Sequence, residues 1–195
     1  MPGDFIYIRK HRLAAIALGG NCGSAVGGPA ETIAAALGDI ADLIGPIVAV
    51  SRFFRTPAFP PGSGPDYVNA AMATTTSLEA DAILDALHRI EARHGRVRKI
   101  RWGARTLDLD LLVIGETVLP DVATVRQWMD LPPALQAERA PEHLILPHPR
   151  LQERAFVLIP LAEILPGWRH PVTGRTVAEM VGALPETEKA SVRPL

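Results

Sequence analysis

The chain contains 195 residues, of which 48% are hydrophobic and 21% charged, a balance that is typical of a globular domain with a sizeable core. Its formal net charge is −1, so no overall positive charge indicates binding to nucleic acid or to an anionic membrane. The single cysteine excludes an internal disulfide framework, and no apolar run reaches the length of a membrane span. The apolar run behind the basic N-terminal segment matches a signal peptide poorly, so we expect a cytoplasmic protein.

The first two thirds of the sequence predict a mixture of strands and helices. Four segments show the alternation or continuous apolarity of strands, and two show the 3.6-residue apolar periodicity of helices. Their order is strand, helix, strand, strand, helix, strand, which is the order of a split βαβ unit. We therefore expect a ferredoxin-like α+β fold, a mainly antiparallel sheet with helices packed on it. The expected strands are 14–18, 47–56, 67–76 and 105–115, and the expected helices are 31–44 and 78–94, the second capped by Ser77 and stopped by Gly95.

The remaining segments are expected to belong to one domain over residues 1–195. Residues 1–12 form an N-terminal extension in this interpretation, and the proline-rich segment 120–143 forms an inserted excursion with one or two short helices. A short helix around 176–184 precedes a polar tail. The expected oligomeric state is a monomer, with a weak dimer as the alternative.

Two aspartates interrupt the apolar strand "RTLDLDLL" (105–112). In an extended strand Leu107, Leu109 and Leu111 point to one face. Asp108 and Asp110 then point together to the other face with Cα atoms ~6.6 Å apart. Two carboxylates so close repel each other unless a cation lies beside them, and a hard divalent ion is the natural candidate. The alternative is that solvent-facing acids protect an edge strand from aggregation.

A basic loop precedes the paired aspartates. Arginine side chains match phosphate oxygens bidentately, so a basic loop that leads into a carboxylate-bearing strand suits a polyphosphate substrate. For the loop alone, two other interpretations stay open: a solvated surface loop, or an RNA-binding patch on which Trp102 stacks a base. An RNA-binding module would need a more basic chain and aromatic residues on the central strands, and the sequence has neither. The basic residues are Arg96, Arg98, Lys99, Arg101 and Arg105.

The whole segment "GRVRKIRWGARTLDLDLL" (95–112) resembles the signature of the 6-hydroxymethyl-7,8-dihydropterin pyrophosphokinase family. Members of this family transfer pyrophosphate from ATP to a pterin alcohol in folate biosynthesis and release AMP. The resemblance extends to five further segments, and it leaves out residues 1–12, the excursion 120–143 and the tail. A nucleotide sensor without transfer activity is the alternative within this resemblance. The further segments are "ALGGN" (17–21), "SRFFRTPAF" (51–59), "PDYVNAAM" (65–72), "RIEARHGRVR" (89–98) and "LPHPRLQERAFVLIPLAEI" (146–164).

The resemblance implies a nucleotide side of the site. Asp108 and Asp110 would hold two Mg²⁺ ions that bridge the phosphates of the co-substrate ATP. Arg96 and Arg98 would lie on a loop that closes over the triphosphate, and Trp102 would help to close it. The first glycine turn, 19–24, departs from the family pattern and is not expected to be catalytic. The implied catalytic residues are Arg96, Arg98, Arg105, Asp108 and Asp110, and the implied ATP-binding residues are Glu91, Arg98, Trp102, Arg105, His148 and Arg154.

The resemblance also implies a pterin side. Asn69 offers both a hydrogen-bond donor and an acceptor, which suits a heterocycle with amide and amine edges. Phe156 would stack on the face of the ring. Tyr67 and Phe156 could equally be core aromatic residues if the residues are considered without the family. The implied pterin-binding residues are Thr56, Pro57, Tyr67, Asn69, Trp102 and Phe156.

Overall fold

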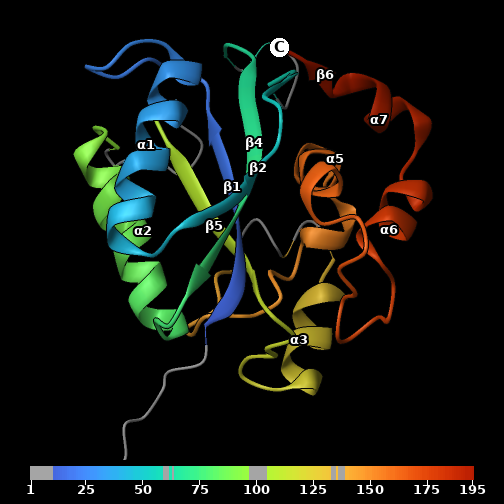
Figure 1. Cartoon of the computed structure of the whole chain (residues 1–195). Helices are drawn as coiled ribbons and strands as arrows, with labels where there is room; N and C mark the ends of the chain where they lie inside the picture. Colours follow the sequence, from blue (N-terminus) through green and yellow to red (C-terminus); the bar gives the residue numbers. More distant parts are fainter. Residues whose placement is uncertain (1–10, 59–61, 63, 97–104, 133–134, 136–138) are drawn as a thin grey trace, which may run out of the picture.

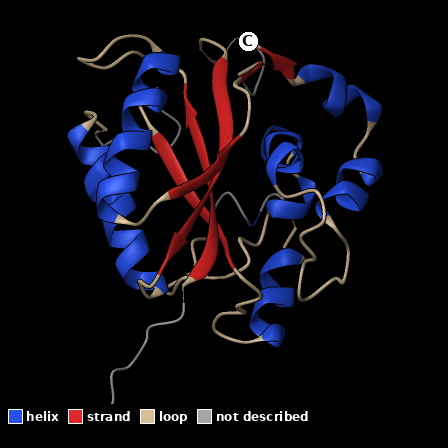
Figure 2. Ribbon diagram, viewed as in Figure 1, coloured by secondary structure: helices blue, strands red, loops and turns tan. Residues whose placement is uncertain are grey.

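The computed structural model describes residues 11–58, 62, 64–96, 105–132, 135 and 139–195. A central antiparallel sheet separates two layers of helices, and a smaller helical segment lies at one end of the sheet (Figure 1). Helices α1 (Pro29–Leu43) and α2 (Ala80–Arg93) cover one face, and α5 (Ala155–Ile164) and α6 (Val177–Ala183) lie beside the other (Figure 2). Among the described residues no helix is both long and apolar enough to cross a bilayer.

The elements follow the predicted order through the first two thirds of the chain. The strands are β1 (Arg12–Gly20), β2 (Ile47–Val50), β3 (Phe54–Thr56), β4 (Tyr67–Thr76), β5 (Asp108–Ile114) and β6 (Arg193–Pro194). The helices are α1 (Pro29–Leu43), α2 (Ala80–Arg93), α3 (Val122–Met129), α5 (Ala155–Ile164), α6 (Val177–Ala183) and α7 (Glu186–Ser191), with a short 3₁₀ turn at Leu151–Glu153.

The strand order confirms the ferredoxin-like expectation. The sheet runs β5, β1, β4, β3, β6, with β2 also paired to β4, and all pairs are antiparallel. Each helix of the split βαβ unit therefore connects two parallel strands that are separated by a third strand. Both helices lie on the same face of the sheet because such crossovers have one hand.

Each face of the sheet has its own apolar core. On the α1 and α2 face, Ile16, Leu109 and Leu111 pack with the buried side of both helices. On the opposite face, Ala15, Ala71 and Leu112 pack with α5 and α6. On β5, Leu109 and Leu111 belong to the first core and Leu112 to the second. The pairing of β1 with β5 shifts register at this point, between Leu111 and Val113. Leu109 and Leu111 thus share one face, as the alternation predicted, and Asp108 and Asp110 are left for the other.

Several local expectations were wrong. The N-cap of α2 is Glu79, not Ser77, although Gly95 follows the helix in the left-handed region, with φ +79°. The expected strand 47–56 is interrupted, because the Ser51 hydroxyl accepts a hydrogen bond from the Ala71 backbone N–H (2.9 Å) between β2 and β3. The polar tail folds back as α7 and β6, which pairs with β3 at the sheet edge.

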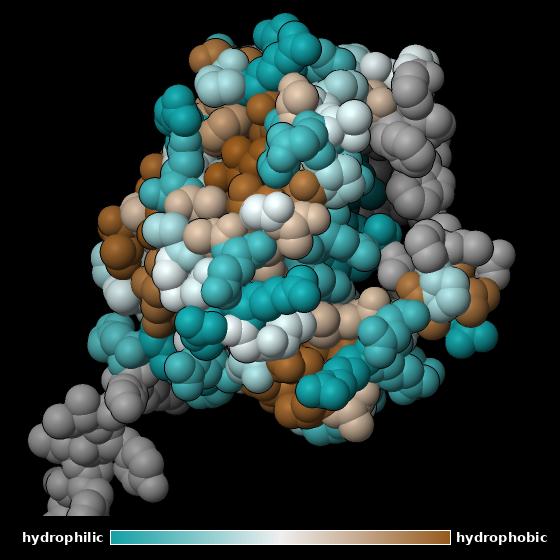
Figure 3. Space-filling model, turned by 90° about the vertical axis from the view of Figure 1, so that its right-hand side faces the viewer, coloured by the Kyte–Doolittle hydropathy of each residue, from teal (hydrophilic) through white to brown (hydrophobic). Residues whose placement is uncertain are grey.

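The outer surface of the α5, α6 and α7 side is mixed in character. Figure 3 shows hydrophilic residues separating several smaller apolar areas on this side of the molecule. α5 itself is apolar nearly all round, with Val157, Leu158 and Leu161 buried between the sheet and α6. Such a helix has no polar stripe, which agrees with its position between two other layers.

Candidate active site

The candidate site lies on the α5 face of the sheet, beyond the part that α5 covers. Asp108, Gly19 and Asn69 are register partners on the neighbouring strands β5, β1 and β4, so they form one row across the sheet. Residues in such a row point to the same face, and strands are spaced about 4.8 Å apart. Asp108 and Asn69 therefore lie about 10 Å apart at the backbone, on either side of a residue without a side chain.

Gly19 leaves room for the side chain of Asn69. A Cβ atom at this position would lie 2.9 Å from Oδ1 of Asn69, closer than real Cβ contacts allow. Asn69 is buried, and its Nδ2 donates to the Thr56 hydroxyl at 2.7 Å. The Asn69 amide is thus held over Gly19 by Thr56. This role of the glycine could not be predicted from the sequence.

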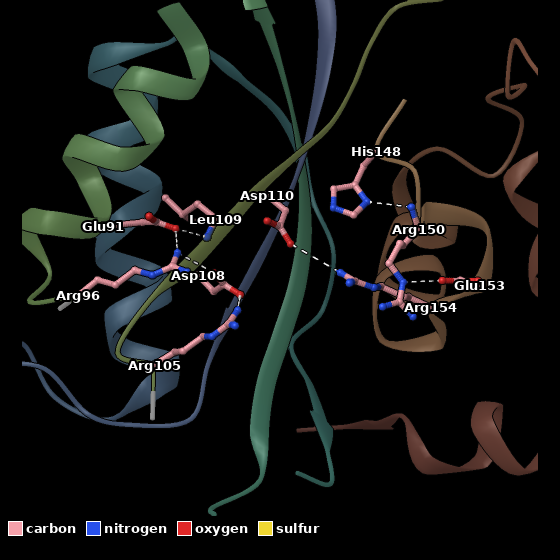
Figure 4. Close-up of polar contacts among 10 residues, drawn as sticks. All are labelled: Glu91, Arg96, Arg105, Asp108, Leu109, Asp110, His148, Arg150, Glu153 and Arg154. Atoms are coloured by element: carbon pink, nitrogen blue, oxygen red, sulfur yellow. Dashed lines mark hydrogen bonds and ion pairs between the residues drawn. The ribbon is translucent and has the colours of Figure 1, made fainter. Parts of the chain in front are cut away.

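Two guanidinium groups neutralise Asp108 within the chain itself. Its carboxylate pairs with Arg96 at 2.6 Å and accepts a hydrogen bond from Arg105 (Figure 4). Burial and then the neighbouring charge of Asp110 raise the pKa of Asp108 above 3.8, and the two arginines oppose this shift only in part. Arg96 and Arg105 therefore supply counter-charge to Asp108 from within the chain.

Glu91 connects α2 to the same strand. Its side chain is 1% exposed, pairs with Arg96, and accepts a hydrogen bond from the Leu109 backbone N–H at 2.9 Å. Leu109 stands between the two aspartates, so Glu91 fixes the strand where the carboxylates are carried. A cavity of about 300 Å³ is lined by His88, Glu91, Ala92 and Arg96.

Asp110 faces a second basic group, at the start of α5. Its carboxylate lies 3.9 Å from the Arg154 guanidinium, and Figure 4 shows the His148 ring nearby. Nδ1 of His148 accepts a hydrogen bond from the Arg150 backbone N–H at 3.1 Å, so a neutral ring carries its proton on Nε2. Burial lowers the pKa of His148 to about 4, which keeps the ring neutral at physiological pH.

Three residues expected on the pterin side, Thr56, Tyr67 and Asn69, lie on the paired strands β3 and β4. Thr56 bonds to Asn69, Tyr67 lies two residues before Asn69 on the same face of β4, and Pro57 is exposed beside Thr56. Phe156 is 39% exposed at the start of α5, and the Arg154 guanidinium lies 5.7 Å from its ring centroid. An aromatic ring with that exposure is free to contact a ligand.

Comparison with known proteins agrees with this geometry. The sequence profile of the 7,8-dihydro-6-hydroxymethylpterin-pyrophosphokinase (HPPK) family matches residues 15–166. The chain belongs to this family.

Curated relatives cover most of the chain. It is 40% identical to the 2-amino-4-hydroxy-6-hydroxymethyldihydropteridine pyrophosphokinase of Pseudomonas aeruginosa, over 87% of this chain and 90% of the relative. It is 35% identical to the enzyme of the same name from Synechocystis, over 86% of this chain and 74% of the relative.

A solved structure shares the fold. The crystal structure of wild-type Plasmodium falciparum HPPK-DHPS has a TM-score of 0.63 and 13% sequence identity to this chain. The match covers 89% of this chain but 44% of that one, so this chain spans less than half of that protein. At this identity the likeness concerns the fold.

The donor set of this HPPK family member fits magnesium shared with a substrate. No cluster of three or more His, Cys, Asp or Glu side chains suited to a metal occurs among the described residues. Mg²⁺ is usually held by one or two carboxylates together with substrate phosphates and water, not by a closed protein cage. Asp108 and Asp110 on one face of β5 meet that need.

The structure brings together most of the residues expected in the site. Arg98 and Trp102 lie outside the described residues, so the expected closing of that loop is not described. Glu91 contacts Arg96 and a strand N–H, contacts that the sequence did not predict. The residues that meet around β5, β4 and the start of α5 are Thr56, Tyr67, Asn69, Glu91, Arg96, Arg105, Asp108, Asp110, His148, Arg154 and Phe156.

Proposed function

We propose that the chain transfers the pyrophosphoryl group of ATP to the hydroxymethyl group of 6-hydroxymethyl-7,8-dihydropterin and releases AMP, in folate biosynthesis. Membership of the HPPK family and the names of its curated relatives support this activity. The observation that carries the proposal is the row formed by Asp108, Gly19 and Asn69. It sets a carboxylate suited to a metal ion and an amide suited to a heterocycle on one face of the sheet, and the absence of a side chain at Gly19 leaves room for the Asn69 amide.

The nucleotide side of the proposal lies around β5. Arg96, Arg105 and Arg154 already face carboxylates, and each guanidinium can turn to a phosphate oxygen when the nucleotide enters. The neutral His148 ring has an N–H to donate to a phosphate oxygen. Glu91 is assigned to the nucleotide side because it lines the cavity beside Arg96. Arg98 and Trp102 are assigned by the family resemblance alone.

The pterin side of the proposal lies around β4. Asn69 would read the polar edge of the ring, and Thr56 fixes which way the Asn69 amide faces. Tyr67 and Phe156 would contact the ring faces, and Pro57 would line the slot. Phe156 is exposed enough to stack, and its contact with Arg154 supports a position next to the proposed nucleotide side.

Two Mg²⁺ ions are proposed to be held by Asp108 and Asp110. When bound they supply neutralisation and alignment of the phosphate oxygens. The residues of the chain perform the remaining tasks: they hold the hydroxymethyl oxygen in line with the β-phosphorus, exclude water and balance the charge that moves to the leaving AMP. No activated serine or cysteine nucleophile is required. A monomeric, cytoplasmic enzyme stays our prediction from the sequence.

The activity is tested by incubating the protein with ATP and Mg²⁺, with and without 6-hydroxymethyl-7,8-dihydropterin, and measuring AMP together with the pterin diphosphate. AMP that appears only with the pterin, in equal yield with the diphosphate, is the expected result. Metal-dependent ATP binding without AMP would instead identify a nucleotide sensor. An Asp110→Asn protein is the matched control, because it should keep the fold and lose the transfer.

A further inference from the structure

The first glycine turn contacts both sides of the site through one buried residue, Asn21. The Asn21 side chain is 6% exposed. Its Oδ1 accepts a hydrogen bond from the Arg105 backbone N–H at 2.8 Å, and its Nδ2 donates to the Pro65 backbone carbonyl at 3.3 Å. One amide thus spans the backbone beside Asp108 and the loop that leads into β4.

The turn holds the Arg105 backbone from both directions. The backbone N–H groups of Asn21 and Cys22 both donate to the Arg105 carbonyl, at 2.9 and 3.2 Å. Gly20 permits this approach, because a Cβ there would lie 2.7 Å from the Thr106 carbonyl oxygen. The Arg105 guanidinium donates to Asp108, so the turn sets the backbone position from which the Arg105 side chain reaches that carboxylate.

The two partners of Asn21 determine which side chain can occupy this position. A backbone N–H can only donate and a backbone carbonyl can only accept, so one side chain must offer an acceptor and a donor at the same reach. Aspartate would keep the acceptor for the Arg105 N–H. Its second oxygen would face the Pro65 carbonyl oxygen, to which it cannot donate a hydrogen bond. Alanine loses both contacts. Asparagine is the residue of this length that satisfies both partners.

We propose that Asn21 is a positioning residue that fixes the Arg105 side of the nucleotide site relative to the Pro65 side of the pterin site. Pro65 lies two residues before Tyr67 and four before Asn69, at the start of β4. Binding at either side then depends on the same amide. This inference rests on the proposed function, and it gives a role in the reaction to a turn that was not expected to be catalytic.

The two halves of the Asn21 amide can be separated by mutation. Asn21→Asp keeps the acceptor for the Arg105 N–H and loses the donor to Pro65, so the KM for the pterin should rise by about 5- to 20-fold while the KM for ATP stays within about twofold. Asn21→Ala loses both contacts, and kcat should fall by about 10- to 100-fold, because small misplacements of reacting groups cost that much.

Ser24→Ala is the matched control in the same turn. Ser24 bonds to the Thr32 hydroxyl at 2.8 Å and to the Val26 N–H, and these bonds involve neither Arg105 nor Pro65. Its loss should lower the Tm without changing either KM. If Asn21→Asp and Asn21→Ala behave like Ser24→Ala, the residue is structural and the inference fails.

The wild-type assay separates this inference from the function on which it rests. Wild-type protein without pterin-dependent AMP release contradicts the proposed function and removes the inference with it. Wild-type activity with unchanged KM values in Asn21→Asp contradicts the inference alone. Unequal changes in the two KM values, at a Tm close to that of Ser24→Ala, support it.

Discussion

Glu91 accepts a hydrogen bond from the backbone N–H of Leu109 at 2.9 Å, so a helix side chain fixes the strand residue that stands between the two site aspartates. The same carboxylate pairs with Arg96, which also pairs with Asp108. One buried acid therefore connects α2, the start of the basic loop and β5.

Replacing Glu91 should lower stability more than an exposed acid does. Glu91→Ala leaves the Leu109 N–H and part of the Arg96 charge without a partner, and the free energy of unfolding should fall by about 2–4 kcal/mol. Glu91→Gln keeps an acceptor for the Leu109 N–H, so its free energy of unfolding should fall by less. Urea unfolding measures both. The control is Glu79→Ala at the N-cap of the same helix, where the side chain makes no cap hydrogen bond and its exposed pair with Arg12 should contribute less than about 1 kcal/mol. Similar losses at the two positions would contradict the connecting role.

Asp108→Asn should abolish transfer without lowering stability at neutral pH. Burial, followed by the charge of Asp110, raises the pKa of Asp108, so the folded state binds a proton more readily than the unfolded state. Stability therefore falls as the pH rises from the ordinary value of 3.8 through the raised pKa. Above that range Asn removes the cost of the charge. Thermal unfolding with EDTA present should give a Tm equal to or above that of the wild type at pH 7, with the difference shrinking on acidification. A difference that grows at lower pH would show that the arginine pairs dominate.

Two histidines, His148 and His170, should make the fold sensitive to mild acid. Burial lowers the pKa of both His148 and His170 to about 4, from 6.5. Their stabilising contribution is complete above pH 6.5 and is lost as the pH falls toward 4, because the unfolded state then binds more protons. His148→Gln and His170→Gln should each reduce the loss of Tm between pH 7 and pH 5.

These two variants should differ in catalysis. His170 lies in the loop before α6, where its Nδ1 accepts a hydrogen bond from the Val172 N–H, away from the site. His170→Gln should keep the wild-type kcat, while His148→Gln should lower it by about 10-fold or more if its N–H contacts a phosphate oxygen. Equal kcat values in the two variants would remove His148 from the proposed nucleotide side.

Gly19→Ala should weaken pterin binding selectively. The new Cβ would lie 2.9 Å from Oδ1 of Asn69, so the amide must move and its bond to Thr56 must weaken. The Kd for the pterin should rise by about 10-fold or more, while the Kd for an ATP analogue with Mg²⁺ changes little. Calorimetric titration measures both dissociation constants.

Gly38→Ala in α1 is the control, since nothing lies within 4 Å of its Cβ position, and it should raise stability by about 0.5–1 kcal/mol. Parallel weakening of both ligands by Gly19→Ala would argue against a pterin-specific role.

The sequence predicted those parts of the fold that depend on local pattern. The paired strands and the helices α1 and α2 have periodic apolar faces, and the Asp108 and Asp110 pair was visible because alternation places both on one face. α5 was not recognised, because a helix buried between layers has no periodic polar face and because Pro160 lies inside it. β6 was missed because two residues in a polar tail pair only through the tertiary fold.

The partners within the site could not be read from the sequence. Asn21 and Arg105 are 84 residues apart, and Glu91 and Leu109 are 18 residues apart. Such contacts depend on how elements meet in space, and a buried side chain that bonds to a backbone group leaves no periodic signal. The family resemblance implied ligand-binding roles for Glu91 and Asp108. It did not predict that Arg96 forms ion pairs with both of these carboxylates.

The row formed by Asp108, Gly19 and Asn69 also couples the two sides of the site through the backbone of β1. The separation between the Cα atoms of Asp108 and Asn69 is set by hydrogen-bonded strand spacing, whereas rotation of either side chain moves only its own polar group. A change in β1 that alters its pairing with β4 or β5 would therefore displace both polar residues relative to each other.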